Sequence, residues 1–418
     1  MSDLSTLVLK FGGTSVGDLD RMRNVAEIIR DEKASGKNLV VVVSAMSGET
    51  NRLLELAHKA VKAPTPRELD CMVATGEQVS AAMLAMILNE SGVPARSLLG
   101  FQMGMKTTED HTRARILGID TETFERAFAN DEVVVAAGFQ GTSDSGEVTT
   151  LGRGGSDTTA VAIAAALSGA CDIYTDVDGV YTADPRICRD ASCLEKIAYE
   201  EMLEMASAGA KVLQIRSVEM GMKYGVPLRV RSSFTRSQGT LVTEEDSDME
   251  HILVSGVSCD RNEAKIALRN VPDIPGIATK CFTPLSDAGI VVDMIIQNIS
   301  QDTKTDLTFT VPRSDLSRAV ELMEKLAAEV GIERVEHDDT IAKLSVVGIG
   351  MRSHAGVATR MFQILADERI NIQMISTSEI KISVVIEDKY AELAVRSLHR
   401  AFELHLSPSE RSSARLAE

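Results

Sequence analysis

An internal repeat occupies the C-terminal part of the chain. The segment Gly276-Ile-Ala-Thr-Lys-Cys-Phe282 matches Gly356-Val-Ala-Thr-Arg-Met-Phe362, an offset of 80 residues that persists through Asp287/Asp367 and Met294/Met374. Each copy reads as strand, helix, strand, strand, helix, which is typical of a small ferredoxin-like α+β sandwich. Since a repeated pattern specifies a repeated fold, we expect two such units, at residues 251–335 and 336–405, with the strand at 251–259 assignable to either. In the second copy the expected elements are Ala342–Val347, Val357–Glu368, Ile372–Thr377, Lys381–Glu387 and Lys389–Leu404.

The first 243 residues have a different pattern, in which strand-like and helix-like segments alternate. Apolar β-branched runs at Leu7–Lys10, Leu39–Ser44 and Val133–Gly138 are typical of strands buried on both faces, and helical stretches at Met22–Lys33 and Gln78–Asn89 separate them. This alternation predicts an α/β domain, a mostly parallel sheet between helices. Ligands of such folds bind at the carboxyl ends of the strands. Residues 244–250 are expected to be a polar linker, and residues 406–418 a polar tail.

The charge of the chain limits its partners. The formal net charge is −17 over 418 residues, and an acidic surface repels nucleic acid and anionic membranes. The sequence shows no secretory signal and no apolar run of membrane-spanning length, and its six cysteines form no C-x-x-C pair. We therefore expect a cytoplasmic protein with reduced thiols, without nucleic-acid or membrane partners. Any anion that it binds needs a locally built site.

Two strand ends offer such a site. The first strand runs into Lys10-Phe11-Gly12-Gly13-Thr14, where adjacent glycines allow successive N–H groups to face one anion, beside the Lys10 ammonium. The second strand is followed by Ser44 and, after a glycine, Thr50. Both segments also suit ordinary turns, and the first is neither a Walker A loop nor a dinucleotide-binding motif.

The segment Gly152-Arg-Gly-Gly-Ser-Asp157 is more specific. It precedes an alanine-rich helix expected at Thr159–Leu167, which Ser156 or Asp157 is placed to cap. Helix N-terminal N–H groups attract anions, and the planar fork of Arg153 suits a carboxylate. The alternative is a capped helix with a surface arginine.

A third region is dense in acids. The segment Asp172–Arg186 reads as a strand followed by an acidic turn, and Lys211 lies near the start of a later helix. These groups suit a nucleoside site, although acids also form turns. The seven histidines, His58 and His399 among them, are scattered without a matching serine or cysteine constellation, and we interpret them as non-catalytic.

Together these motifs resemble the aspartokinase family of the amino-acid-kinase superfold, from about residue 6 to residue 405. The resemblance implies that ATP phosphorylates the side-chain carboxylate of L-aspartate, the first step of lysine, threonine and methionine biosynthesis. It implies catalytic roles for Lys10 and Asp157, with Asp157 orienting Lys10. The implied aspartate-binding residues are Ser44, Thr50, Glu77, Arg153, Gly154 and Ser156. The implied ATP-binding residues are Lys10, Phe11, Gly12, Gly13, Thr175, Asp176, Tyr181, Arg186 and Lys211, with Mg²⁺ carried by ATP rather than held by protein side chains.

The repeat resembles two ACT domains, the amino-acid-sensing modules of this family. This implies feedback inhibition by lysine, threonine or both. The implied effector-binding residues are Asp273, Ile274, Gly276, Ile277, Ala278 and Gln297 in the first unit, and Gly356, Val357, Ala358, Asn371, Ile372, Ser378 and Glu379 in the second. Ala355 stands where the family often has proline, which affects the expected stiffness of that loop. We expect a homo-oligomer, or a heterotetramer with a shorter regulatory subunit that starts near Met249.

Two other functions fit parts of the sequence. One is another carboxylate or carbamate kinase of the same superfold, against which Arg153 and Glu77 argue. The other is a non-catalytic amino-acid sensor, which the loss of Lys10 or Asp157 would have favoured; both residues are present.

Overall fold

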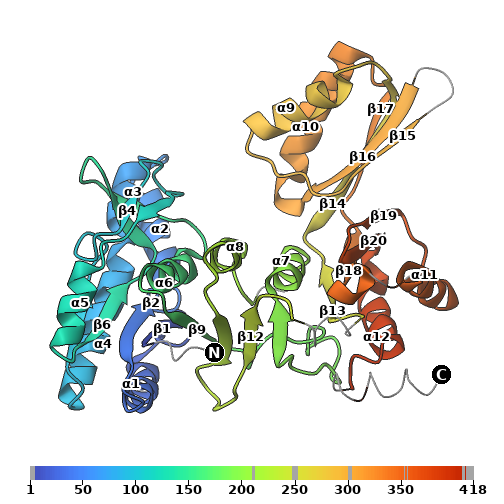
Figure 1. Ribbon diagram of the computed structural model, residues 1–418. Helices are drawn as coiled ribbons and strands as arrows, with labels where there is room; N and C mark the ends of the chain where they lie inside the picture. The colour runs from blue at the N-terminus through green and yellow to red at the C-terminus, as the bar shows by residue number, and fades with distance from the viewer. Residues whose placement is uncertain are drawn as a thin grey trace. The chain divides into compact units, whose positions relative to one another are not determined.

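The computed structural model (Figure 1) describes residues 5–209, 212–246, 253–299, 304–352, 354, 356–406 and 410. Contacts divide the chain into two compact units, which are described separately. The first contains Met1–Val180, Cys193–Ala206 and Lys211–Asp246, and the second contains Tyr181–Ser192, Ser207–Ala210 and Ser247–Glu418. Met249, Lys211, Ser353, Ala355 and most of the expected tail lie outside the described residues.

The first unit is built on an eight-stranded sheet in the order β10-β12-β11-β9-β1-β2-β6-β3. Only the β11–β12 pair is antiparallel among the pairings described, which confirms the predicted mostly parallel sheet. The strands are β1 (Thr6–Phe11), β2 (Asn38–Val43), β3 (Ala95–Leu98), β6 (Val133–Ala137), β9 (Ala170–Thr175), β10 (Lys196–Ala198), β11 (Leu228–Ser232) and β12 (Thr240–Thr243). A smaller sheet has the order β5-β4-β7-β8, from Ile116–Gly118, Lys106–Thr107, Gln140–Ser143 and Val148–Thr150.

Helices cover both faces of the large sheet. The buried apolar sides of α1 (Leu19–Lys33) and α4 (Thr75–Glu90) pack with alternate residues of β1, β2 and β6 in one core. On the other face lies α6 (Gly155–Ala166), which contacts β1, β2 and β9. The remaining helices of this unit are α2 (Glu49–Ala60), α3 (Pro66–Val73), α5 (Glu122–Ala129), α7 (Tyr199–Ser207) and α8 (Ile215–Tyr224).

Helix α6 begins four residues earlier than the sequence pattern indicated. Gly154 is its N-cap residue, with a left-handed φ of 73° and no side-chain capping hydrogen bond. The prediction that Ser156 or Asp157 caps the helix is therefore wrong: both lie in its first turn. The left-handed conformation, which glycine adopts without steric cost, allows the loop to end at that point.

The second unit contains two four-stranded antiparallel sheets of the same order, β15-β16-β14-β17 and β19-β20-β18-β13. In the first, β14 (Glu263–Pro272), α9 (Ile277–Asp287), β15 (Ile295–Ile299), β16 (Lys304–Pro312), α10 (Leu316–Val330) and β17 (Arg334–Asp338) follow in sequence. In the second, β18 (Ile341–Val347), α11 (Val357–Asp367), β19 (Met374–Thr377), β20 (Lys381–Glu387) and α12 (Ala391–Ala401) are joined by β13 (Gly256–Asp260). The second sheet thus takes its last strand from a segment that precedes both copies.

The two copies of the repeat pack against each other. Met294 and Met374, which are partners in the 80-residue repeat, lie in one buried cluster with Ile341 and Val385. Lys343 of the second copy forms an ion pair with Asp293 of the first. The contact thus includes one pair of equivalent residues and an ion pair between non-equivalent positions of the repeat.

A segment from the N-terminal half also belongs to this unit. Ala183 and Cys188 are buried in the same core as Leu344. The carbonyl oxygen of Thr182 accepts a hydrogen bond from the Val257 amide at 2.8 Å, and its hydroxyl is hydrogen-bonded to His399 Nε2 at 2.9 Å. The segment Tyr181–Ser192 is therefore part of the fold of the repeat region, which its sequence did not indicate.

By length and composition alone, the stretch Pro66–Glu90 could cross a membrane. In the structure it is divided between α3 and α4, and half of its apolar 18-residue window is buried. The core helix of a soluble protein passes the same test, so this finding is weak evidence for a membrane span.

Candidate active site

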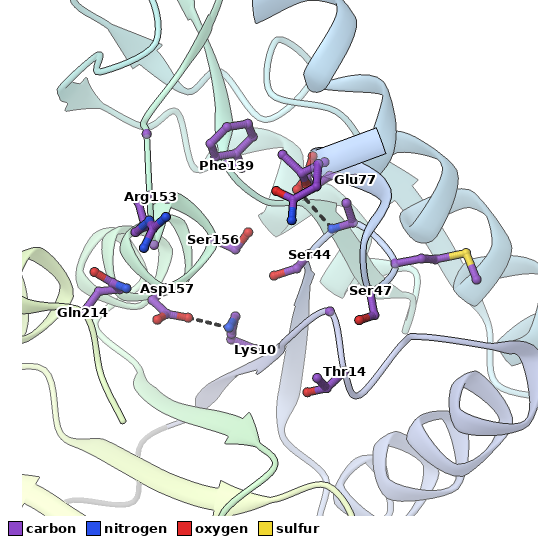
Figure 2. A pocket seen from close by; sticks show the side chains of 18 of the residues that line it. Lys10, Thr14, Ser44, Ser47, Glu77, Phe139, Arg153, Ser156, Asp157 and Gln214 are labelled. Atoms are coloured by element: carbon purple, nitrogen blue, oxygen red, sulfur yellow. Dashed lines mark hydrogen bonds and ion pairs between the residues drawn. The ribbon is translucent and has the colours of Figure 1, made fainter. Parts of the chain in front are cut away.

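A cavity of about 480 Å³ lies in the first unit, where β1 and β2 end (Figure 2). Its walls come from several parts of the chain. These are the end of β1 and the loops after β1 and β2, the start of α2, the start of α6 with the preceding loop, and single residues of α4, of the turn between β6 and β7, and of the segment before α8. The lining residues are Lys10, Gly13, Thr14, Ser44, Ala45, Met46, Ser47, Gly48, Thr50, Asn51, Glu77, Phe139, Gly152, Arg153, Gly154, Gly155, Ser156, Asp157 and Gln214.

The loops after β1 and β2 approach each other closely. Ser44 N–H donates to the Phe11 carbonyl oxygen at 3.1 Å, and a Cβ atom at Gly13 would lie only 2.8 Å from the Ala45 carbonyl oxygen. A side chain at Gly13 would push the two loops apart. Glycine is thus required at position 13 for the close backbone approach at the edge of the cavity.

Two helices begin at the cavity. Gly154 starts α6 and Gly48 starts α2, and both adopt left-handed φ values, 73° and 81°, without a side-chain capping bond. First-turn N–H groups have no partners within their own helix, and the helix dipole makes these ends attractive to anions. The structure therefore supplies positive potential locally in a strongly acidic chain.

Lys10 and Asp157 form an ion pair across the cavity floor. Lys10 Nζ lies 2.5 Å from Asp157 Oδ1, and each side chain is 11% exposed. Lys10 comes from the carboxyl end of β1, and Asp157 comes from the first turn of α6 (Figure 2). Because the lysine stem is flexible, this contact holds the ammonium at the position where the strand end meets the helix N-terminus.

Glu77 is a buried acid in the cavity wall. It lies on α4 and is 3% exposed. Its Oε1 accepts the Ala45 N–H at 3.0 Å, and its Oε2 has no hydrogen-bond partner among the described residues. Burial raises the pKa of Glu77 to about 7, despite the lowering effect of the Ala45 amide. A carboxylate with a free buried oxygen is suited to an ammonium group of a ligand.

The structure gathers the predicted substrate and catalytic residues in this cavity. Its walls contain all eight of them: Lys10, Ser44, Thr50, Glu77, Arg153, Gly154, Ser156 and Asp157. Arg153 is exposed on the loop before α6, and Figure 2 shows its side chain beside Gln214 and Asp157. Their individual roles stay predictions.

The predicted nucleotide residues are more dispersed. Gly13 lines the cavity, and Phe11 and Gly12 adjoin it in sequence. Thr175 ends β9 and Asp176 follows it. Since β9 pairs in parallel with β1, both lie beside the carboxyl end of β1, near Lys10. Tyr181 and Arg186 belong to the second unit, where Arg186 pairs with Asp184 at 2.7 Å. Lys211 lies outside the described residues.

Five further polar or aromatic residues line the cavity and were not predicted: Thr14, Ser47, Asn51, Phe139 and Gln214. Gln214 is the N-cap residue of α8, and a Cβ atom at Gly154 would clash with its side chain, 2.0 Å from Cγ. Thr14 and Ser47 lie in the segments that follow the first two predicted strands, so their place in the sequence could have predicted that they line the cavity. Nothing in the local sequence of Gln214 indicated that α8 would begin beside α6.

The predicted effector residues lie mainly at one end of each small sheet. Val271 and Ile299 both pair with Thr305, so the loop after β14, containing Asp273 and Gly276, lies at the same end as the close of β15. In the second copy the loop before Gly356 and the turn at Ser378–Glu379 also share an end, where Arg352 lies 3.6 Å from Glu379. Asn371 and Ile372 precede β19 and lie at the opposite end.

Comparison with known proteins agrees with this arrangement. The family model for the amino acid kinase family matches residues 5–232, and an ACT domain model matches residues 269–326 and 344–402. The aspartate kinase of Stutzerimonas stutzeri is 57% identical over 403 residues, covering 96% of this chain and 98% of the relative. The chain belongs to the aspartokinase family.

Solved structures of this family have the same fold. Escherichia coli aspartokinase III in complex with aspartate and ADP is 29% identical, with a TM-score of 0.76 over 95% of this chain and 99% of that one. The same enzyme in complex with lysine and aspartate has a TM-score of 0.75, with 29% identity and the same coverage. The predicted family and fold class are thereby confirmed.

The burial of Glu77 predicts a pH-dependent stability in the ligand-free protein. Its folded pKa of about 7 exceeds its ordinary value of 4.5, so the folded state binds more protons between these values and loses stability as pH rises. Glu77→Gln keeps an acceptor for the Ala45 N–H and removes this loss. We expect the variant to exceed wild type in free energy of unfolding at pH 8 by up to about 3 kcal/mol, and to match it near pH 4.5.

Denaturant unfolding of the full chain at several pH values measures this difference. Glu90→Gln, an exposed position at the end of the same helix, is the matched control and should leave the pH profile unchanged. Parallel profiles for wild type and Glu77→Gln would contradict the assigned pKa.

Proposed function

We propose that this cavity is where the chain, an aspartate kinase, transfers the γ-phosphate of ATP to the side-chain carboxylate of L-aspartate, forming ADP and 4-phospho-L-aspartate. The observation that carries the proposal is the meeting of Lys10 with two helix N-termini in one cavity that also contains a buried, half-satisfied carboxylate. Lys10 and the helix N-termini suit the anionic phosphoryl group and the carboxylates of an amino acid, and the buried carboxylate suits its ammonium group. A site that excludes solvent slows the hydrolysis of an acyl phosphate.

Each charge of aspartate has a proposed partner. The ammonium group lies against Glu77 Oε2, which thereby stays ionised. One carboxylate lies against the Arg153 guanidinium and the N-terminus of α6 at Ser156, where fork geometry and N–H groups favour it. Hydroxyls of Ser44 and Thr50 complete the contacts from the opposite wall, and Gly154 keeps the backbone close to the ligand.

The proposed chemistry requires no general base. A side-chain carboxylate is already ionised at neutral pH, so it can attack the γ-phosphorus as the P–O bond to ADP breaks. Catalysis then depends on positioning and on stabilising the charge that develops on the phosphoryl oxygens. Lys10 supplies that stabilisation, and Asp157 fixes its ammonium.

ATP is proposed to extend from Lys10 along the sheet edge. Phe11, Gly12 and Gly13 offer backbone groups, and Thr175 and Asp176 lie at the end of the neighbouring strand. For Tyr181, Arg186 and Lys211, the proposed nucleotide role rests on the resemblance to the family alone. Mg²⁺ is proposed to arrive with the phosphates, which supply much of its coordination. Within the described parts of the chain, no group of three acidic, histidine or cysteine side chains forms a metal site.

An ATP-dependent hydroxamate assay tests the substrate directly. Aspartate, glutamate, acetylglutamate and carbamate are offered in parallel, and the acyl phosphate is trapped with hydroxylamine. We expect product with aspartate and little with the others. Equal or faster turnover of another carboxylate would contradict the assigned substrate.

Arg153→Lys tests the proposed carboxylate contact. An ammonium keeps the charge but cannot reproduce the bidentate fork, so the KM for aspartate should rise by about tenfold or more while the KM for ATP changes by less than about twofold. Steady-state kinetics with each substrate varied gives both values. A KM for ATP that rises as much as that for aspartate would show that Arg153 serves the nucleotide.

The ACT domains are proposed to bind lysine, threonine or both as feedback inhibitors. In each copy the exposed loop after the first strand ends at a left-handed glycine that starts a helix, Gly276 for α9 and Gly356 for α11. Such a helix start offers N–H groups to the carboxylate of an amino acid, and Asp273 offers an acceptor for its ammonium. The other predicted effector residues flank these loops, except Asn371 and Ile372. We propose that these two contribute to an effector site from another chain of the oligomer.

Assembly and location complete the proposal. The outer strands β15 and β19 carry exposed Ile295 and Ile375, and an unpaired sheet edge with apolar side chains favours pairing with another chain. We propose a homo-oligomer, or a heterotetramer with a shorter subunit that starts near Met249, located in the cytoplasm.

Asp273→Ala tests the effector site without touching the cavity. We expect kcat and both KM values to remain near wild type in the absence of effector. The concentration for half inhibition should rise by about tenfold or more, since a charge-assisted hydrogen bond contributes roughly 1.5–3 kcal/mol. Calorimetric titration of lysine and of threonine measures the loss, and wild-type affinity for both would exclude Asp273 from the site.

A further inference from the structure

A buried carboxylate outside the cavity holds the loop that carries Arg153. Asp70 lies on α3 with no solvent exposure. Its Oδ1 accepts the Thr150 hydroxyl at 2.5 Å, and its Oδ2 accepts the Thr150 N–H at 3.1 Å and the Thr112 N–H at 2.9 Å. His111 Nδ1 is hydrogen-bonded to the same Oδ2 at 2.9 Å. Burial of an acid is costly unless its oxygens are satisfied in this way.

An arginine from another helix holds the next residues of the loop. Arg216, on α8, donates from Nη1 to the Leu151 carbonyl oxygen at 2.6 Å and from Nη2 to the Ala114 carbonyl oxygen at 3.2 Å. The Ala114 N–H in turn donates to the Thr150 carbonyl oxygen at 2.9 Å. Asp70 and Arg216 therefore connect the same two backbone segments, residues 111–114 and 150–151, from α3 and α8.

The two segments are also packed tightly at the next position. A Cβ atom at Gly152 would lie 2.9 Å from the Thr112 carbonyl oxygen, and Gly152 has a φ of 78°. The backbone is thus held by hydrogen bonds at Thr150 and Leu151 and is closely packed at Gly152. Arg153 follows immediately, and its side chain is exposed.

We propose that Asp70 and Arg216 are positioning residues for substrate binding, which act by fixing the backbone from which Arg153 and the α6 N-terminus reach the substrate. The proposal rests on the proposed function, because it assumes that this loop binds aspartate. An exposed arginine has many rotamers, so the position of its guanidinium group depends on where its backbone is held. A shift of about 1 Å at a substrate-positioning group is enough to cost about 100-fold in rate.

A purely structural role for Asp70 predicts a different result. It would lower the yield or the stability of the domain, but it would affect both substrates alike. A positioning role acts mainly on aspartate, because Arg153 directly follows the held residues. Lys10 and the end of β9 belong to other strands, and Asp157, which pairs with Lys10, lies four residues farther along, inside α6. The ratio of the two KM values separates these roles.

The variants are Asp70→Asn and Thr150→Val, with Thr150→Ser and Asp110→Asn as matched controls. The Asp70→Asn change replaces one acceptor by a donor. At the Oδ2 position that donor would face the Thr150 and Thr112 N–H groups, and at the Oδ1 position it would face the Thr150 hydroxyl and the Thr112 N–H. The Thr150→Val change removes the hydroxyl donor. Thr150→Ser retains that hydroxyl, and Asp110→Asn makes the same chemical change at an exposed residue next to His111. We expect the KM for aspartate to rise about tenfold or more in the first two variants, with the KM for ATP within about twofold, and both controls to stay near wild type.

Hydrogen–deuterium exchange of the substrate-free proteins gives a readout that does not depend on activity. We expect peptides covering residues 148–157 to exchange faster in Asp70→Asn and Thr150→Val, with β1 and β2 unchanged. If wild type and Asp110→Asn phosphorylate aspartate, the proposed function holds and the variants test only this inference. If they do not, the function fails and exchange alone decides whether the loop is held by Asp70.

The inference is overturned by a folded Asp70→Asn or Thr150→Val protein that keeps wild-type exchange at residues 148–157. Equal increases in both KM values would also overturn it. Should Asp70→Asn fail to fold, Thr150→Val and its serine counterpart decide the question, because they change one hydrogen bond of the same carboxylate.

Discussion

The ion pair between Lys10 and Asp157 joins the two halves of the site. It connects the end of β1 to the first turn of α6 at 2.5 Å, with both side chains largely buried. Two charges removed from water are costly unless each satisfies the other, so the pair holds the strand end and the helix N-terminus in one arrangement. Everything else in the cavity is placed relative to that junction: the loop after β2 lies against Gly13, and Glu77 is tied to that loop through the Ala45 amide.

The acidity of the chain makes this local construction necessary. With a net charge of −17, the overall field opposes the approach of nucleotide and amino-acid carboxylates. The positive potential of the backbone N–H groups at the starts of α2 and α6 does not depend on which side chains lie on the surface. Both helices begin at a left-handed glycine, so no capping side chain occupies these N–H groups. Glu77 adds the opposite feature, a buried acid with one oxygen unpaired among the described residues, whose charge an arriving ammonium would stabilise. Under the proposed function, the carboxylates and the ammonium of aspartate are bound at two different positions of the cavity.

Much of this could be predicted from sequence, and the failures have physical causes. The alternating apolar runs predicted the parallel sheet, and the 80-residue repeat predicted the two sandwiches, because each pattern follows from burial periodicity within one segment. The start of α6 was placed too late, since glycine and serine give no helical periodicity. The contributions of β13 and of Tyr181–Ser192 to the repeat region were missed or left open because they depend on long-range packing. Gln214, Asp70 and Arg216 were missed for the same reason: each acts on a loop that is distant in sequence.

A double-mutant cycle on Lys10 and Asp157 tests the central claim most directly. Lys10→Met and Asp157→Asn are assayed singly and together for kcat with both substrates saturating, after circular dichroism confirms folding. If the pair acts as one unit, each single variant loses about 10²–10³-fold in kcat. The kcat of the double variant is then little lower than that of the less active single variant. Losses that multiply in the double variant, or a folded Lys10→Met protein with wild-type kcat, would contradict the account.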